Sequence, residues 1–250
     1  MAMTMMSAMA QKTDHTFLNR EDVPNSKMVL NAPPSEGDPR FEYDKARYFW
    51  GKSLRDTPRG QLAMEDCDSS PMGMARLFSP SFGTIISPDA TPEIYKLIAL
   101  LDDDAGWWGT DDAKNHYMRP RPFMYFKEHT SFPADEESLA KNGSYPSGHT
   151  AGCYAIALVL SEINPENQDT ILRRGMAMGD SRVICGFHWQ SDVDAGYLVA
   201  AGVVARCHAD KGFMKQLARA KKEFARLQKR GLVRQMKVCT KPEHGEKKSK

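Results

Sequence analysis

Hydrophobic residues recur at helical spacing along most of the chain after residue 40. The clearest case lies near the C-terminus, where apolar residues alternate in steps of four and three before Gly231, a typical stop: Phe213, Leu217, Ala220, Phe224 and Leu227. Apolar runs over residues 94–101 and 151–163 predict two further helices. No segment alternates apolar and polar residues convincingly, as a half-buried strand does. The sequence therefore predicts an all-α fold with a single compact helical domain.

Prolines and capping residues mark where the predicted helices begin. Thr57-Pro58, Ser87-Pro88 and Thr91-Pro92 each pair a capping side chain with a proline suited to the first helical turn. Residues 1–38 are rich in Pro, Ser and Asn and predict a flexible N-terminal arm. We expect the helical domain over residues 39–231 and a basic, disordered tail over residues 232–250.

Composition fits this picture and limits the partners. The chain has 250 residues, of which 41% are hydrophobic, which is enough for one core. Its net charge is only +2, yet residues 211–250 hold 14 Lys and Arg against 3 acidic residues. These charges overlap a helical pattern without interleaved aromatic residues, so we interpret them as a solvated helix face and expect no nucleic-acid partner. Apolar runs are far shorter than the roughly 20 residues of a membrane span, so we expect no membrane insertion.

The N-terminus and the cysteines bear on the compartment. Residues 1–11 are rich in Met and Ala, and Ala8-Met9-Ala10 fits a signal-peptidase site, so a signal-peptide remnant is favoured over a disordered start. Five cysteines without C-x-x-C spacing argue against zinc: Cys67, Cys153, Cys185, Cys207 and Cys239. Four of them could pair in an oxidising compartment, or they could be core thiols.

Three short segments carry the chemistry. They are Lys114-x6-Arg121-Pro122, Pro146-Ser147-Gly148-His149 and Ser181-Arg182-x5-His188-x3-Asp192. Together they supply three permanent cations, two imidazoles, a glycine-flanked turn and a carboxylate. A tetrahedral oxyanion needs this set of groups, so the sequence predicts an enzyme that acts on phosphate esters.

In the first segment, prolines on both sides of Arg121 prevent a helix through it. A helix that carries Lys114 should therefore end near Tyr117 or Met118, and Arg121 should project from stiff backbone toward two phosphate oxygens. Arg119 competes for this role, but the spacing favours Arg121. The alternative for the segment alone is an ordinary surface turn.

The second segment is a turn that precedes an apolar run. The free N–H groups at a helix N-terminus bind anions, Gly148 permits close backbone approach, and Ser147 can add a hydroxyl donor. His149 is then placed to protonate a leaving oxygen. In the alternative interpretation Ser147 only caps the helix and His149 is a bystander.

The third segment places a histidine four residues before a carboxylate. Asp192 can accept the Nδ1–H of His188, which fixes the tautomer and leaves Nε2 free to attack, while Arg182 adds a second guanidinium. A metal half-site is the alternative, but no third ligand stands nearby in sequence. An aspartate cluster also suggests a metal, although we favour a solvated turn: Asp102, Asp103, Asp104, Asp111 and Asp112. One of these acids could instead orient Lys114 or Arg121.

The three segments together resemble the type 2 phosphatidic acid phosphatase superfamily, which includes vanadium haloperoxidases. Residues 141–150 and 179–194 are similar to bacterial class A non-specific acid phosphatases, and the resemblance runs from about residue 41 to residue 229. It implies a soluble, periplasmic, all-helical enzyme that is a homo-oligomer, needs no cofactor or metal, and hydrolyses phosphate monoesters of many kinds. It also implies the residue roles: His188 as nucleophile, His149 as general acid and base, Asp192 as orienter, and Lys114, Arg121, Ser147, Gly148 and Arg182 as the phosphate cradle.

Two rival functions stay open from the sequence. A vanadate-dependent peroxidase uses a similar cradle, and a non-catalytic phosphate-binding protein could use the basic tail to hold nucleic acid. Transfer of phosphate to an alcohol is a further activity that a phosphohistidine allows. The sequence does not fix the preferred ester, the subunit number or the cysteine pairing.

Overall fold

Helices make up all the regular structure of the part of the chain that can be described. The computed structural model describes residues 16–236, and no strand occurs in that range. The predicted all-α class is therefore confirmed. The main helices are α1 (Ser26–Val29), α2 (Pro39–Ser53), α3 (Pro58–Glu65), α4 (Pro71–Phe82), α5 (Pro92–Asp102), α6 (Gly109–Tyr117), α7 (Pro122–Phe126), α8 (Glu136–Ala140), α9 (Gly148–Ile163), α10 (Gln168–Ile184), α11 (Gln190–Cys207) and α12 (Lys211–Lys229).

Four short turns complete the chain path. Three are 3₁₀ turns: η1 (Arg20–Asp22), η3 (Pro133–Asp135) and η4 (Pro165–Asn167). The fourth, η2 (Asp103–Trp108), is a π-helical turn that joins α5 to α6 without a break. The predicted start at Thr57-Pro58 is confirmed, because the Thr57 side chain accepts the N–H of Gly60. Thr91 precedes α5 as predicted, but no helix begins at Pro88.

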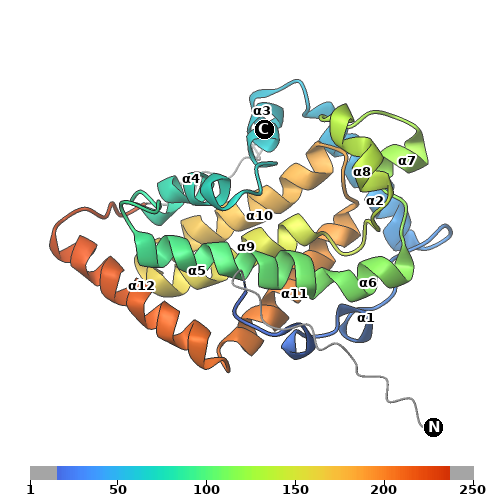
Figure 1. Cartoon of the computed structure of the whole chain (residues 1–250). Helices are drawn as coiled ribbons and strands as arrows, with labels where there is room; N and C mark the ends of the chain where they lie inside the picture. The colour runs from blue at the N-terminus through green and yellow to red at the C-terminus, as the bar shows by residue number, and fades with distance from the viewer. Residues whose placement is uncertain (1–15, 237–250) are drawn as a thin grey trace, which may run out of the picture.

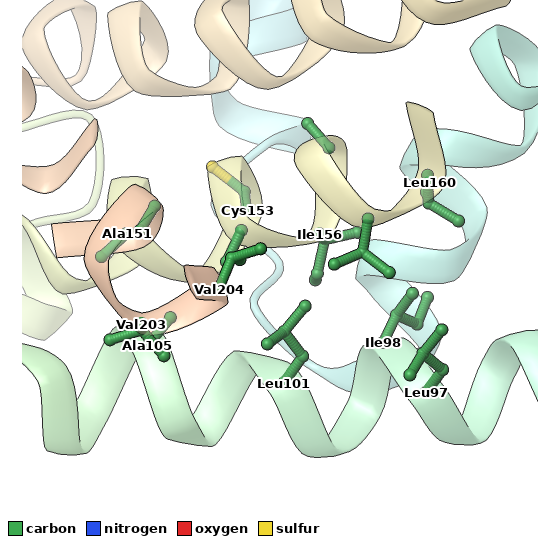
Figure 2. Packing of buried hydrophobic residues seen from close by; sticks show 14 of the residues in the cluster. Leu97, Ile98, Leu101, Ala105, Ala151, Cys153, Ile156, Leu160, Val203 and Val204 are labelled. Carbon is green, nitrogen blue, oxygen red and sulfur yellow. The ribbon is translucent and has the colours of Figure 1, made fainter. Parts of the chain in front are cut away.

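The core is built around α9. This helix packs against α10, α11, α5 and η2, and Figure 1 shows it in the middle of the molecule with these elements around it. Figure 2 shows Leu97, Ile98 and Leu101 of α5 pointing toward Ile156 and Leu160 of α9. All five side chains are completely buried. Because α9 is apolar around most of its circumference, burial on several sides is the arrangement that removes it from water.

The C-terminal helix follows its predicted pattern. Phe213, Leu217, Ala220 and Phe224 are buried on one face of α12, and Gly231 adopts a positive φ of 69° just beyond it. The Lys and Arg residues of α12 are exposed, so the solvated basic face is confirmed for this helix. No helix within residues 16–236 has the length and apolar character needed to cross a bilayer.

Residues 16–38, which belong to the predicted N-terminal arm, make contacts with the helical domain. Phe17 and Leu18 are buried, and their N–H groups donate to the Asp104 carboxylate at 2.8 and 3.1 Å. Apolar side chains and backbone donors thus tie this stretch to the domain. At the other end, Arg234 donates its N–H to the Gly83 carbonyl at 2.8 Å, so residues 232–236 also contact the domain. Residues 1–15 and 237–250, with the proposed signal remnant and most of the basic tail, lie outside the described range.

Helix α11, which begins just after His188, packs closely against the start of α9, which carries His149. This contact holds the second and third candidate segments next to each other. A Cβ atom added at Gly196 would lie 2.9 Å from both the Ser147 carbonyl oxygen and the Thr150 Cβ, closer than atoms normally pack. At Gly202, six residues further along α11, an added Cβ would have nothing within 4 Å. Glycine at position 196 therefore allows the helices to approach, and glycine at position 202 does not serve that purpose.

We expect Gly196→Ala to lower the free energy of unfolding by about 1–3 kcal/mol, because the added methyl group overpacks the α9–α11 contact. The matched variant Gly202→Ala should raise it by up to about 1 kcal/mol through better helix propensity. Urea unfolding followed by circular dichroism measures both. Equal effects of the two substitutions would contradict the packing argument.

Candidate active site

His188 lies in the turn between α10 and α11, and Asp192 lies in the first turn of α11. The Nδ1 atom of His188 is 3.3 Å from Oδ2 of Asp192, and its Nε2 atom is 3.1 Å from Nη1 of Arg121. A guanidinium can only donate, so Nε2 must accept and the ring proton must reside on Nδ1. The arrangement is that of a neutral imidazole with a lone pair on Nε2.

Electrostatics favour the same protonation state. Burial of His188, which is 3% exposed, and the nearby charge of Arg121 lower the pKa of the imidazole well below its ordinary value. Burial alone would raise the pKa of Asp192, but the charge of Arg119 and hydrogen bonds from His188 and Ser144 outweigh it and lower that pKa. A neutral histidine therefore faces an ionised carboxylate.

Asp192 is held by several donors besides His188. It accepts the backbone N–H of Trp189 at 2.9 Å, a short hydrogen bond from the Ser144 hydroxyl, and Nη1 of Arg119 at 2.6 Å. Arg119 also donates to Asp44 of α2 at 2.7 Å. Because Arg119 is paired with two buried carboxylates, it is occupied within the protein and Arg121 is the arginine left beside the His188 ring.

The three candidate phosphate-binding cations are buried without acidic partners. Lys114, Arg121 and Arg182 are 7%, 3% and 7% exposed, and none has a carboxylate oxygen within 4 Å among the described residues. Lys114 donates to the Gly143 carbonyl at 2.8 Å, and Arg121 donates to the Leu139 and Phe187 carbonyls. The Nε atom of Arg182 is buried and has no hydrogen-bond partner.

Mutual repulsion shows that these cations belong to one cluster. Burial, followed by the charge of Arg121, lowers the pKa of Lys114 to about 7. Burial and the charge of Arg182 lower the pKa of Arg121 to about 10, despite the opposing effect of Asp192. Unpaired buried charge is costly, so this cluster is arranged to receive an anion.

His149 lies in the first turn of α9, close to the same cluster. Burial and the charge of Arg182 lower its pKa to about 3. Its Nε2 atom is 2.7 Å from the Asp66 carbonyl oxygen, which can only accept, so Nε2 carries a hydrogen. Nδ1 is therefore the nitrogen that is free to take up and release a second proton.

Ser147 and Gly148 begin α9 and join it to the third segment. The Ser147 side chain accepts the N–H of Thr150 at 3.3 Å, so the capping role is present, and the Ser147 N–H donates to the Asp192 carbonyl at 2.9 Å. A Cβ at Gly148 would lie 2.4 Å from the Gly106 carbonyl oxygen. The contact with η2 thus requires glycine at this position.

The comparisons with known proteins agree with this geometry. A model of the PAP2 superfamily matches residues 101–213, which include all three segments. A non-specific acid phosphatase of Providencia stuartii is 50% identical over 87% of this chain and 88% of its own length. The chain belongs to the PAP2 superfamily, with the bacterial class A acid phosphatases.

Two other acid phosphatases also match this chain over most of its length. A non-specific acid phosphatase of Salmonella typhimurium is 46% identical over 85% of both chains. An acid phosphatase of Zymomonas mobilis is 35% identical over 79% of this chain and 74% of its own length. The class A resemblance found in the three segments therefore extends over most of this PAP2 chain.

Several supporting residues of this PAP2 site had no recognisable signal in the sequence. Asp44 lies on α2, far along the chain from Arg119, and only the fold joins them. Asp66 accepts from Arg174 and from the Ser181 hydroxyl, while its carbonyl contacts His149. Ser144 lies within residues 141–150, which carry the family resemblance, and its hydroxyl could have been recognised as a possible partner for Asp192.

The aspartate cluster differs from the predicted solvated turn. Asp104 is completely buried in η2, where it accepts the N–H groups of Phe17 and Leu18, and Asp112 pairs with Arg20 at 2.9 Å. These acids anchor the N-terminal stretch. Among residues 16–236, no group of His, Cys, Asp and Glu side chains is arranged to hold a metal ion.

Proposed function

We propose that this chain is an acid phosphatase that hydrolyses phosphate monoesters of broad structure through a phosphohistidine on Nε2 of His188. The observation that carries the proposal is the cluster of three buried cations, none of them paired with a carboxylate, beside a neutral imidazole whose lone pair faces Arg121. Such a cluster favours a compact, multiply charged anion, and the lone pair supplies the nucleophile.

Binding comes first in the proposed mechanism. Lys114, Arg121 and Arg182 hold the equatorial oxygens of the phosphoryl group, and the N-terminus of α9 contributes backbone N–H groups. When phosphate binds, the Nη1–H of Arg121 donates a hydrogen bond to a phosphate oxygen instead of to His188 Nε2, which leaves the Nε2 lone pair free for attack. Positive charge already in place then offsets the charge that develops in the transition state.

Two displacements follow. His149 first takes up on Nδ1 the proton that the substrate monoanion brings. His188 Nε2 then forms a bond to phosphorus as the ester P–O bond breaks, and His149 gives that proton to the departing alkoxide. Asp192 stabilises the positive charge that appears on the His188 ring. A water molecule then attacks phosphorus and passes a proton to His149 as the P–N bond breaks, which releases inorganic phosphate.

Hydrolysis of p-nitrophenyl phosphate at pH 5–6 with EDTA present tests the proposal. We expect turnover that chelation does not reduce and that vanadate inhibits in competition with substrate. A phosphate-binding protein would bind the ester without releasing p-nitrophenol. Bromide oxidation on addition of vanadate and peroxide, without ester hydrolysis, would favour the peroxidase alternative.

The pH dependence should depend on the substrate as well as on the enzyme. In the free protein the pKa of His149 is about 3, so this residue is neutral at the working pH and the required proton must arrive with the substrate monoanion. The second pKa of a phosphate monoester is about 6. We expect kcat/KM to be constant just below that pH and to fall about tenfold per unit above it.

Esters that differ in their second pKa provide the measurement. The descending limb of kcat/KM should move with the pKa of each ester, because the proton is carried by the monoanion. A limb that stays at one pH for all esters would instead belong to a group of the enzyme.

We further propose that the enzyme is periplasmic, forms a homo-oligomer and binds no nucleic acid, and that an alcohol can replace water at the phosphohistidine. The signal-like residues 1–11 and the membership in the class A group support the first two points. Cell fractionation, light scattering and detection of a transferred phosphate ester test these points separately.

A further inference from the structure

Two cysteines lie side by side at the edge of the candidate active site. Cys67 lies two residues after the end of α3, and Cys185 caps the C-terminus of α10, three residues before His188. Their sulfur atoms are 3.7 Å apart, and both thiols point at the Ala63 carbonyl oxygen, at 3.3 and 3.4 Å. Cys185 is buried, whereas Cys67 is partly exposed.

We propose that Cys67 and Cys185 form a disulfide that joins the end of α3 to the turn carrying the nucleophile. The two sulfur atoms are in contact, and side-chain rotation must bring them to the ~2.05 Å of a covalent bond. Cys153 is placed differently, because its thiol points at the Thr150 carbonyl within α9, at 3.5 Å. Among the described cysteines, Cys67 and Cys185 are thus the pair whose geometry favours oxidation.

The chemistry starts at Cys67. Its hydrogen bond with Cys185 and the charge of Arg182, opposed by burial and by Asp66, lower the pKa of the Cys67 thiol to about 7. The Cys67 thiolate attacks a disulfide oxidant such as oxidised glutathione and expels one thiolate. Cys185 then loses its proton, attacks the Cys67 sulfur and expels the second thiol. Two electrons pass from the cysteine pair to the oxidant, which leaves as two thiols.

The bond should also change the phosphate cradle, a point that rests on the proposed function. Nη1 of Arg182 lies 3.0 Å from the Cys67 sulfur. In the reduced protein a Cys67 thiolate competes with phosphate for this guanidinium. In the disulfide that sulfur is uncharged, so the charge of Arg182 is available to the substrate.

Peptide mapping of the whole protein tests the bond without any assay of activity. The protein is equilibrated with oxidised glutathione, quenched in acid, alkylated and digested without reductant. We expect one crosslinked peptide that joins Cys67 to Cys185, and a melting temperature at least about 5 °C above that of the reduced protein. Alkylation of both residues after oxidation, or a link from either residue to Cys239, would overturn the proposal.

Kinetics test the link to Arg182. At pH 7.5 we expect reduction to raise KM about three- to tenfold with little change in kcat, and at pH 5, where the thiol is protonated, to leave KM unchanged. Cys67→Ser should abolish this response to reductant, and the control Cys153→Ala should retain it. An identical KM in both redox states at pH 7.5 would show that the disulfide does not change phosphate binding by Arg182. Absence of turnover in both states would contradict the proposed function, but the peptide map would still test the disulfide.

Discussion

Replacement of His188 by alanine should reduce kcat for p-nitrophenyl phosphate by at least about 10⁴-fold, because in the proposed mechanism His188 forms the covalent intermediate. The residue is buried and its Nδ1 is 3.3 Å from Asp192, so the substitution also leaves that carboxylate short of a donor. His188→Asn keeps an N–H near the position of Nδ1 and separates this effect from catalysis. We expect the asparagine variant to fold and to be equally inactive.

His149→Ala should cause the phosphoenzyme intermediate to accumulate. With a good leaving group the first displacement needs little acid assistance, whereas the second loses its base, so phosphoenzyme should accumulate. Phosphohistidine is stable in base and labile in acid, and digestion of the trapped protein should locate the phosphoryl group on His188. Recovery of phosphate on a serine would overturn the assignment of the nucleophile.

His129→Ala is the matched control for both histidines. The His129 side chain is 82% exposed and pairs with Glu136 at 3.1 Å, whereas His188 is buried. We expect its kcat and KM to stay within about twofold of the wild type. A loss comparable to that of His188→Ala would mean that the substitutions act through stability rather than through the site.

The helices and the three segments could be predicted because their signals are local. A proline after Thr57 and the spacing of Phe213, Leu217 and Phe224 fix helix ends and faces within a few residues. The predicted end of the helix carrying Lys114 is also confirmed, since α6 ends at Tyr117 before the prolines. In each case neighbouring residues alone decide the outcome.

Partners distant in sequence could not be predicted in this way. Arg119 appeared only as a competitor of Arg121, because its role depends on Asp44 and Asp192, which approach it from α2 and α11. Likewise the buried state of Asp104 depends on the backbone of Phe17 and Leu18, in a stretch whose composition is typical of a flexible arm. A single sequence gives no pairing information for such contacts.

Asp192→Asn is the substitution with the second largest expected effect, because this carboxylate pairs with the buried Arg119 and, in the proposed mechanism, orients His188. It is completely buried, and Nη1 of Arg119 and Nδ1 of His188 lie 2.6 and 3.3 Å from its oxygens. An amide removes one of the two counter-charges of Arg119, although Asp44 remains. Breaking a buried ion pair lowers the free energy of unfolding by about 3–5 kcal/mol. Because Asp44 still pairs with Arg119, we expect a loss at the lower end of this range, about 3 kcal/mol.

The same substitution should reduce kcat by about 10³-fold. The amide nitrogen can face Nδ1 of His188 and donate to it, which favours the tautomer with the proton on Nε2 and removes the nucleophilic lone pair. Titration of the ring nitrogens by ¹⁵N NMR would detect that tautomer directly. At a loss of about 3 kcal/mol the melting temperature should fall by about 6–12 °C, so assays must be run well below the transition.

Asp194→Asn provides the control on the same helix. Asp194 is exposed and accepts from Gln190 at 2.8 Å, without contact to His188 or Arg119. Its kcat should stay within about twofold of the wild type and its melting temperature within about 2 °C. If Asp192→Asn kept kcat within tenfold of the wild type, the carboxylate would be a structural anchor for Arg119, and another group would have to orient the nucleophile.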